Sequence, residues 1–211
     1  MHPVLESLQE RYPDLQPCMH AINAAYEVLR ETFATGGKLL VCGNGGSAAD
    51  SEHIVGELMK GFLRRRPISN GMRERLIEKD PENGRYIAEH LQGVLPAIAL
   101  SAHTGLVSAI SNDVAADMVF AQQVYGYGSV GDTLLGISTS GNSVNVLHAM
   151  RVAQVLGMRV IGLTGRSGGQ MVDLCDVVIC APYDDVSRIQ ERHLPIYHAL
   201  CIMLEQEFFN A

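Results

Sequence analysis

The chain has 211 residues, of which 47% are hydrophobic and 18% charged, and its formal net charge is -7. These values are typical of a globular protein, and the acidic balance disfavours nucleic acid as a partner, because phosphate backbones bind basic surfaces. No apolar run approaches the roughly 18 residues of a membrane span, and no secretion signal is recognisable. The five cysteines show no C-x-x-C spacing and indicate buried, reduced thiols. We therefore expect a cytoplasmic protein without a membrane partner.

The N-terminal segment has the apolar periodicity of two helices over residues 4–33, interrupted by Pro13 and Pro17. Both helices have an apolar face that requires a partner. That partner is either the chain's own domain or a second copy of the chain, and the pattern leaves both open. A strand is predicted directly afterwards, at residues 38–42.

From Pro96 onward, short apolar runs alternate with helical patterns. The predicted strands are 97–100, 133–138, 159–164 and 177–180, and the predicted helical segments are 104–111, 114–125, 142–156 and 169–174. Such alternation indicates an α/β fold with a parallel sheet covered on both faces. Ligands of these sheets bind at the carboxyl ends of the strands, so the turns after Cys42 and Ser138 are the expected binding region.

Residues 68–94 differ from this pattern, because they are charged and helical, with Asp80-Pro81 as an expected helix start. The segment is predicted to be a helical insertion that leaves the sheet. The run Arg64–Arg66 just before it is interpreted as a solvated helix end.

A glycine-rich turn, residues 43–47, connects the first predicted strand to a helix. Its residues tolerate unusual backbone angles, and the helix N-terminus favours an anion. His53 and Glu57 follow at i, i+4 spacing, so they share a helix face and can meet on a metal or a substrate. The turn also fits the dinucleotide pattern G-x-G-x-x-A, but the acidic residue expected about 20 positions on is missing, which disfavours a nucleotide.

A second loop has the composition of a phosphate site. Its hydroxyls surround Gly141 before a helix and come from Ser138, Thr139, Ser140 and Ser143. One hydroxyl suffices to cap the helix, so the others suggest a site that binds a sugar phosphate through uncharged hydrogen-bond donors.

The last helix has polar residues in an apolar run, namely Gln190, His193 and His198. Gln190 and His198 are eight residues apart and lie on roughly one face. Two helices can therefore offer two ligands each to one zinc ion, and a hydrogen-bonded polar pocket is the alternative. Pro195 lies between these residues and is expected to kink the helix.

The segments CGNGGS and ISTSGNS, with H-x-x-x-E on one helix and Q-x7-H on the last, resemble the sugar isomerase (SIS) domain family and, within it, the phosphoheptose isomerases. The resemblance implies a three-layer, flavodoxin-like, five-stranded parallel sheet. One domain would span residues 1–211, with N-terminal helices at 1–35 and the insertion at 68–94. It also implies a homotetramer, or dimer of dimers, with active sites at subunit interfaces.

Carried over by this resemblance, the substrate and its phosphate would contact Asn44, Gly45, Ser47, Ser138, Thr139, Ser140, Ser143 and Gln190. Zinc would be held by His53, Glu57, Gln190 and His198. The implied reaction converts sedoheptulose 7-phosphate into D-glycero-D-manno-heptose 7-phosphate through an enediol, with Glu57 as base and His198 as acid/base partner. Zinc binding and the base role compete for Glu57. A non-catalytic SIS protein that binds or senses a phosphosugar is the alternative.

Three positions depart from the family pattern. Ala102-His103-Thr104 replaces a Thr-Asp-Thr-like segment, and His103 is expected to take over the lost contact. Ser187 replaces an acidic residue, with Asp184 and Asp185 upstream. Gly61 replaces an arginine, for which Lys60 or Arg64–Arg66 are the possible substitutes.

Overall fold

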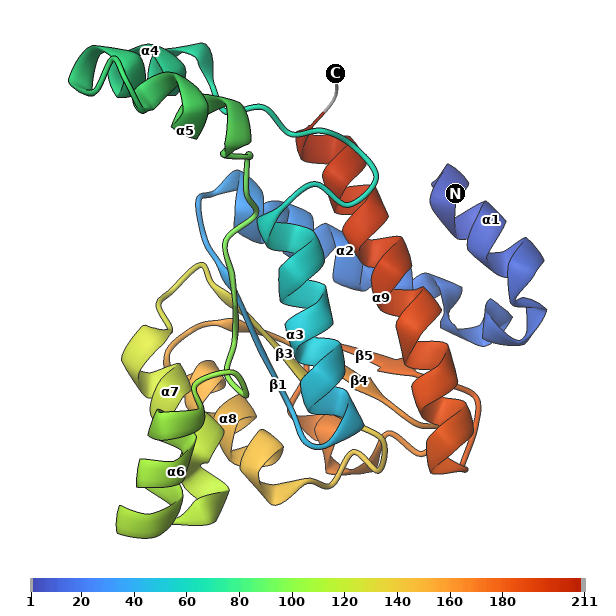
Figure 1. Cartoon of the computed structure of the whole chain (residues 1–211). Coiled ribbons are helices and arrows are strands. Elements are labelled where there is room, and N and C mark those ends of the chain that lie inside the picture. The colour runs from blue at the N-terminus through green and yellow to red at the C-terminus, as the bar shows by residue number, and fades with distance from the viewer. Residues whose placement is uncertain (1, 210–211) are drawn as a thin grey trace.

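The computed structural model describes residues 2–209 and contains a five-stranded, all-parallel sheet in the order β2-β1-β3-β4-β5 (Figure 1). The strands are β1 (Leu39–Gly43), β2 (Ala97–Ala99), β3 (Thr133–Ser138), β4 (Arg159–Thr164) and β5 (Val177–Cys180). This order is that of flavodoxin-like folds, with its switch point between β1 and β3. The predicted fold class is thereby confirmed.

Helices cover both faces of the sheet (Figure 1). One layer contains α1 (Pro3–Arg11), α2 (Met19–Ala34), α3 (Gly46–Met59) and α9 (Val186–Phe208), and the other contains α6 (Thr104–Asp113), α7 (Val119–Tyr127) and α8 (Val144–Val155). Short 3-10 segments lie at Pro13–Cys18, Ala116–Met118 and Gly169–Asp173.

The strands are buried on both faces, which explains their continuous apolar sequences. In β1, Leu39 and Val41 belong to the core beneath α2 and α9, whereas Leu40 and Cys42 belong to the core beneath α7 and α8. The side-chain period of two thus divides one apolar run between two cores.

Two questions about the terminal helices are answered by their packing. Leu5 and Leu8 of α1 are buried in the chain's own core, so the N-terminal helices have a partner within the domain. Pro195 lies inside α9, which is one helix over its 23 residues.

All five cysteines are free; Cys175 and Cys180 are only half-buried. Among the described residues, no helix has both the length and the apolar character needed to span a membrane.

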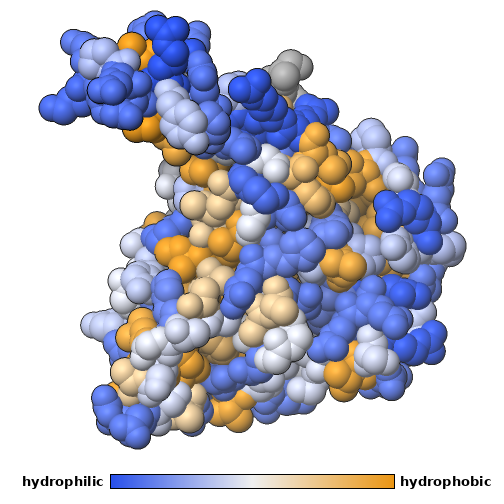
Figure 2. Space-filling view, viewed as in Figure 1, coloured by the Kyte–Doolittle hydropathy of each residue, from blue (hydrophilic) through white to orange (hydrophobic). Residues whose placement is uncertain are grey.

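The insertion forms two helices, α4 (Asn70–Lys79) and α5 (Gly84–His90), which project from the body as an arm (Figure 1). The helix start expected at Asp80 is wrong. Asp80 ends α4, and its carboxylate accepts from the backbone N–H of Asn83 in the turn before α5. No side chain of α4 is buried, and Figure 2 shows mostly hydrophilic residues over the arm.

The interpretation of Arg64–Arg66 as a solvated helix end is also wrong for Arg66, which is completely buried. Its guanidinium pairs with Glu205 of α9, with Nε 2.8 Å from Oε1. The spacing of charges along the chain cannot reveal a partner that is 139 residues away.

Candidate active site

The loops after β1 and β3 meet at the carboxyl ends of their strands. Asn44 and Asn145 join them through two amide hydrogen bonds, each 2.9 Å long. Asn145 was not predicted, because its position within α8 gives no signal in the sequence. The glycine-rich turn and the serine-rich loop therefore form one continuous polar surface at the switch point of the sheet.

The serine-rich loop concentrates hydroxyls as predicted. Ser138 Oγ lies 2.9 Å from Ser143 Oγ and 3.5 Å from Ser140 Oγ. Gly141, with φ +66°, allows the chain to turn back between them, a conformation that favours glycine. Thr139 is half-buried in the same turn. These hydroxyls precede the N-terminus of α8, an arrangement suited to phosphate oxygens.

Gln190 lies beside the glycine-rich turn. A Cβ placed on Gly46 would be only 2.6 Å from Gln190 Nε2, so the amide lies directly over the start of α3. Ser47 in the same turn is buried, whereas Asn44 and Gly45 are exposed. Gln190 is thus positioned beside the residues expected to bind the phosphate.

His53 and Glu57 meet on α3, as their spacing predicts. His53 Nε2 lies 3.2 Å from Glu57 Oε1, and Lys60 Nζ lies 2.8 Å from Glu57 Oε2. Glu57 is largely buried, while the His53 side chain is 42% exposed. The carboxylate therefore presents one oxygen to a lysine and the other to an imidazole.

Tyr197 of α9 orients the His53 ring. Its hydroxyl donates to Asp50 Oδ1 at 3.2 Å and lies 3.0 Å from His53 Nδ1. Because the hydroxyl has one proton and an ionised carboxylate only accepts, Nδ1 of His53 is the donor to Tyr197. In the neutral form of the ring, Nε2 then carries the lone pair, and it faces Glu57 Oε1. Burial raises the pKa of Asp50, although the hydrogen bond from Tyr197 and the charge of His53 oppose this.

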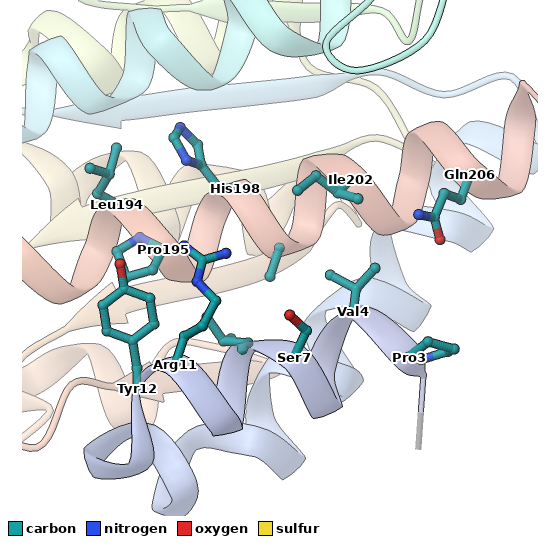
Figure 3. A pocket seen from close by; sticks show the side chains of 12 residues that line it. Pro3, Val4, Ser7, Arg11, Tyr12, Leu194, Pro195, His198, Ile202 and Gln206 are labelled. Atoms are coloured by element: carbon teal, nitrogen blue, oxygen red, sulfur yellow. The ribbon is translucent and has the colours of Figure 1, made fainter.

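His198 completes the group from α9. Its ring centroid is 5.0 Å from that of His53 and 5.2 Å from that of Phe62. Figure 3 shows the ring on the side of α9 that faces away from α1. Nε2 is buried and has no hydrogen-bond partner within residues 2–209. Burial, and secondarily the charge of His53, lower the pKa of His198, which favours the neutral imidazole.

These donors have the chemistry of a zinc site. When His53 is neutral, its Nε2 and Glu57 Oε1 present lone pairs 3.2 Å apart, and a cation bound by both would satisfy them, as it would the orphaned Nε2 of His198. The contact from His53 Nδ1 to Tyr197 resembles the outer-shell hydrogen bonds that orient histidine ligands. In the described part of the chain, however, no three His, Cys, Asp or Glu side chains form a preassembled metal group.

Other polar residues named from the sequence have different surroundings. His193 is fully buried, with Nε2 3.3 Å from the carbonyl oxygen of Thr164, and belongs to the packing of α9 on β4. Asp50 and Tyr197 were not assigned to the site from the sequence; Asp50 lies three residues before His53 on the same helix, and Tyr197 is next to His198.

Comparisons with known proteins identify the family of the chain. The SIS domain family matches residues 6–75 and 84–165. A phosphoheptose isomerase of Aliarcobacter butzleri is 41% identical over 97% of this chain and 89% of its own length, and one of Roseiflexus sp. is 43% identical over 90% and 83%. The chain belongs to the SIS domain family, within the phosphoheptose isomerases.

Solved structures of this family have the same fold. A phosphoheptose isomerase from Francisella tularensis is 32% identical, with a TM-score of 0.77 over 95% of this chain and 93% of its own. The enzyme from Neisseria gonorrhoeae is 34% identical, with a TM-score of 0.75 over 95% and 94%. Between the two stretches matched by the SIS domain family, only residues 76–83, inside the α4–α5 arm, lie outside the match.

The structure locates the three departures from the phosphoheptose isomerase pattern. Lys60 contacts Glu57 directly, whereas Arg66 is used internally, so Lys60 is the better substitute for the arginine replaced by Gly61. Ser187 donates to Asp185, the residue that caps α9.

His103 has a fixed tautomer. Gln123 donates from Nε2 to the carbonyl oxygens of Leu100 and Val119, so its Oε1, 3.0 Å from His103 Nδ1, must accept. In the neutral ring, His103 Nε2 is then the acceptor, at the carboxyl end of β2.

Proposed function

We propose that this protein is a phosphosugar isomerase that converts sedoheptulose 7-phosphate into D-glycero-D-manno-heptose 7-phosphate. The observation that carries the proposal is the group of His53, Glu57 and His198 on facing helices, beside two loops suited to phosphate. A binding protein without catalysis would have little need for a carboxylate and two imidazoles in contact.

Substrate binding is assigned to the polar surface at the switch point. The phosphate would be held by hydroxyls and backbone at the serine-rich loop, and the sugar would extend across the glycine-rich turn. The residues in these roles are Asn44, Gly45, Ser47, Ser138, Thr139, Ser140, Ser143 and Gln190. Neutral donors at a helix N-terminus bind phosphate without requiring an arginine.

Proton transfer is assigned to Glu57 and His198. Glu57 removes the proton from the carbon beside the carbonyl and returns it to the neighbouring carbon, which moves the carbonyl by one position. His198, whose pKa is lowered chiefly by burial, is neutral near pH 7 and can exchange a proton with the oxygens of the enediol. Lys60 is paired with Glu57 Oε2, so Oε1 is the oxygen that takes up the proton from the substrate.

A zinc site is assigned to His53, Glu57, Gln190 and His198. The lone pair of His53 Nε2 and the orphaned Nε2 of His198 support it. Bound zinc would polarise the substrate carbonyl and stabilise negative charge on its oxygen. If Glu57 binds zinc, its strength as a base falls, so the two roles of Glu57 compete.

The assembly is proposed to be a homotetramer, or dimer of dimers, in the cytoplasm. A groove of about 490 Å³ between α1 and α9 supports this, since Val4, Leu194 and Ile202 line it together with His198 (Figure 3). A second copy covering this groove would bury these apolar side chains. Light scattering after size-exclusion chromatography measures the assembly directly, and a monomer would refute it.

Catalysis is tested by incubating the protein with sedoheptulose 7-phosphate and following the aldose by NMR. Glu57→Gln is expected to lower kcat by about 10²–10⁴-fold while still binding the sugar phosphate, measured as thermal stabilisation. Glu52→Gln, an exposed carboxylate on the same helix, is the matched control. Binding without turnover in the wild type would instead identify a phosphosugar-binding protein.

A further inference from the structure

Arg66 closes the C-terminal end of α3 from the loop that follows it. Its Nη1 donates to the carbonyl oxygen of Leu58 at 2.8 Å, and its Nη2 donates to that of Glu57 at 3.0 Å. Carbonyls in the last turn of a helix have no partner within the helix, and a cation there also complements the helix dipole. Arg66 therefore fixes the turn that carries the Glu57 side chain.

Glu205 holds the other side of the same guanidinium. It accepts from Arg66 Nε at 2.8 Å and from the backbone N–H groups of Phe62 and Leu63, both at 2.8 Å. Burial by itself would raise the pKa of Glu205, but these donors outweigh burial and hold the pKa below its ordinary value. The carboxylate is therefore charged at neutral pH and ties α9 to the chain that follows α3.

The same contacts reach His198. Phe62, whose N–H is held by Glu205, packs its ring 5.2 Å from the ring of His198. We propose that the buried pair Arg66–Glu205 is a positioning device that sets Glu57 and His198 at their working separation. This inference rests on the proposed function, since it assumes that these two residues move the protons.

The chain segment that follows α5 is hydrogen-bonded to Arg66 and to the loop after α3. The N–H of Gly93 donates to the carbonyl oxygen of Arg66 at 2.7 Å, and the N–H of Gly61 donates to Gln92 Oε1 at 2.7 Å. Substitutions on the arm itself are therefore the appropriate controls. They change charged residues of the insertion without touching the pair.

The test compares Arg66→Lys and Glu205→Gln with Arg75→Lys and Glu78→Gln, which make the same changes at exposed positions of α4. Lysine cannot reach Glu205 and two carbonyls together, and glutamine places an N–H₂ group against a backbone donor. We expect kcat per folded molecule to fall by about ten- to hundredfold in both pair variants, because a displacement near 1 Å has this effect. KM should stay within about twofold, since the serine-rich loop precedes α8 and the glycine-rich turn lies at the opposite end of α3 from Arg66.

Histidine ring NMR of ¹⁵N-labelled protein provides a readout that does not need turnover. The His198 signals should shift in both pair variants and in neither control. If the wild type does not isomerise the sugar, the proposed function fails, and the NMR comparison still tests the pair. Unchanged kcat and unchanged His198 signals would overturn the proposal. So would failure of both pair variants to fold, since the pair would then determine folding and not positioning.

Discussion

The hydroxyl of Tyr197 lies 3.0 Å from Nδ1 of His53, across the contact between α9 and α3. Tyr197 donates its hydroxyl hydrogen bond to Asp50, so these two residues, one from each helix, place the hydrogen of neutral His53 on Nδ1. The direction of the His53 lone pair is therefore set by residues outside the predicted quartet.

Tyr197→Phe removes this orientation without removing the ring. We expect zinc affinity to fall by about ten- to hundredfold, the usual effect of losing an outer-shell hydrogen bond. Metal competition with a chelating dye measures it. Tyr26→Phe, whose hydroxyl contacts Glu207 at 3.5 Å on α9, is the matched control. Equal zinc affinities in the two variants would refute the orienting role of Tyr197.

Gly46→Ala tests whether Gln190 contacts the substrate. The added methyl would lie 2.6 Å from Gln190 Nε2, so the amide must move away from the glycine-rich turn. KM should rise by about tenfold, the equivalent of one hydrogen bond, with the free energy of unfolding little changed.

Gly56→Ala is the control within the same helix, because its added Cβ meets no atom within 4 Å. It should stabilise α3 by about 0.5–1 kcal/mol and leave KM unchanged. A KM for Gly46→Ala equal to that of the control would show that Gln190 does not touch substrate.

His103→Ala tests whether His103 binds the sugar part of the substrate. Its fixed acceptor, Nε2, is suited to a sugar hydroxyl, so kcat/KM for the heptose phosphate should fall by about tenfold. Inhibition by inorganic phosphate should not change, since the phosphate loops are untouched. His90→Ala on the arm is the control. A proportional loss of phosphate binding would contradict a role limited to the sugar.

The stability of the protein in acid tests whether buried His193 has a lowered pKa. Burial lowers its pKa from 6.5 to about 4, so between these values the unfolded chain binds a proton that the folded chain excludes. Stability is therefore complete above pH 6.5 and falls as the pH decreases towards 4, by up to about 3 kcal/mol. Urea unfolding at pH 7.5 and pH 5 measures the loss. His193→Gln should reduce it, whereas exposed His20→Gln should not; equal losses in all three proteins would refute the assignment.

Local sequence patterns were sufficient for most of the fold. The strands at 133–138, 159–164 and 177–180 begin and end where the apolar runs predict, since a strand buried on both faces needs continuous apolar residues. The boundary near residue 114 was less accurate. A short 3-10 segment lies at Ala116–Met118, so α7 begins only at Val119.

Charged residues were the weakest part of the prediction. Arg64, Arg65 and Arg66 look alike in the sequence, yet Arg66 is completely buried. Burying a guanidinium is unfavourable unless a carboxylate and hydrogen-bond acceptors meet it, and these come from Glu205 and from the end of α3. No local pattern contains that information.

The sequence by itself determined the strands, the two phosphate-type loops and the pairing of His53 with Glu57, because each depends on residues a few positions apart. Tertiary structure decided which distant groups complete them: Asn145 for Asn44, Tyr197 for His53, and Glu205 for Arg66. The physical reason is that helix and strand periods fix local faces. Contacts between elements depend on how the elements pack, and a hydrogen bond between them has no period along the chain.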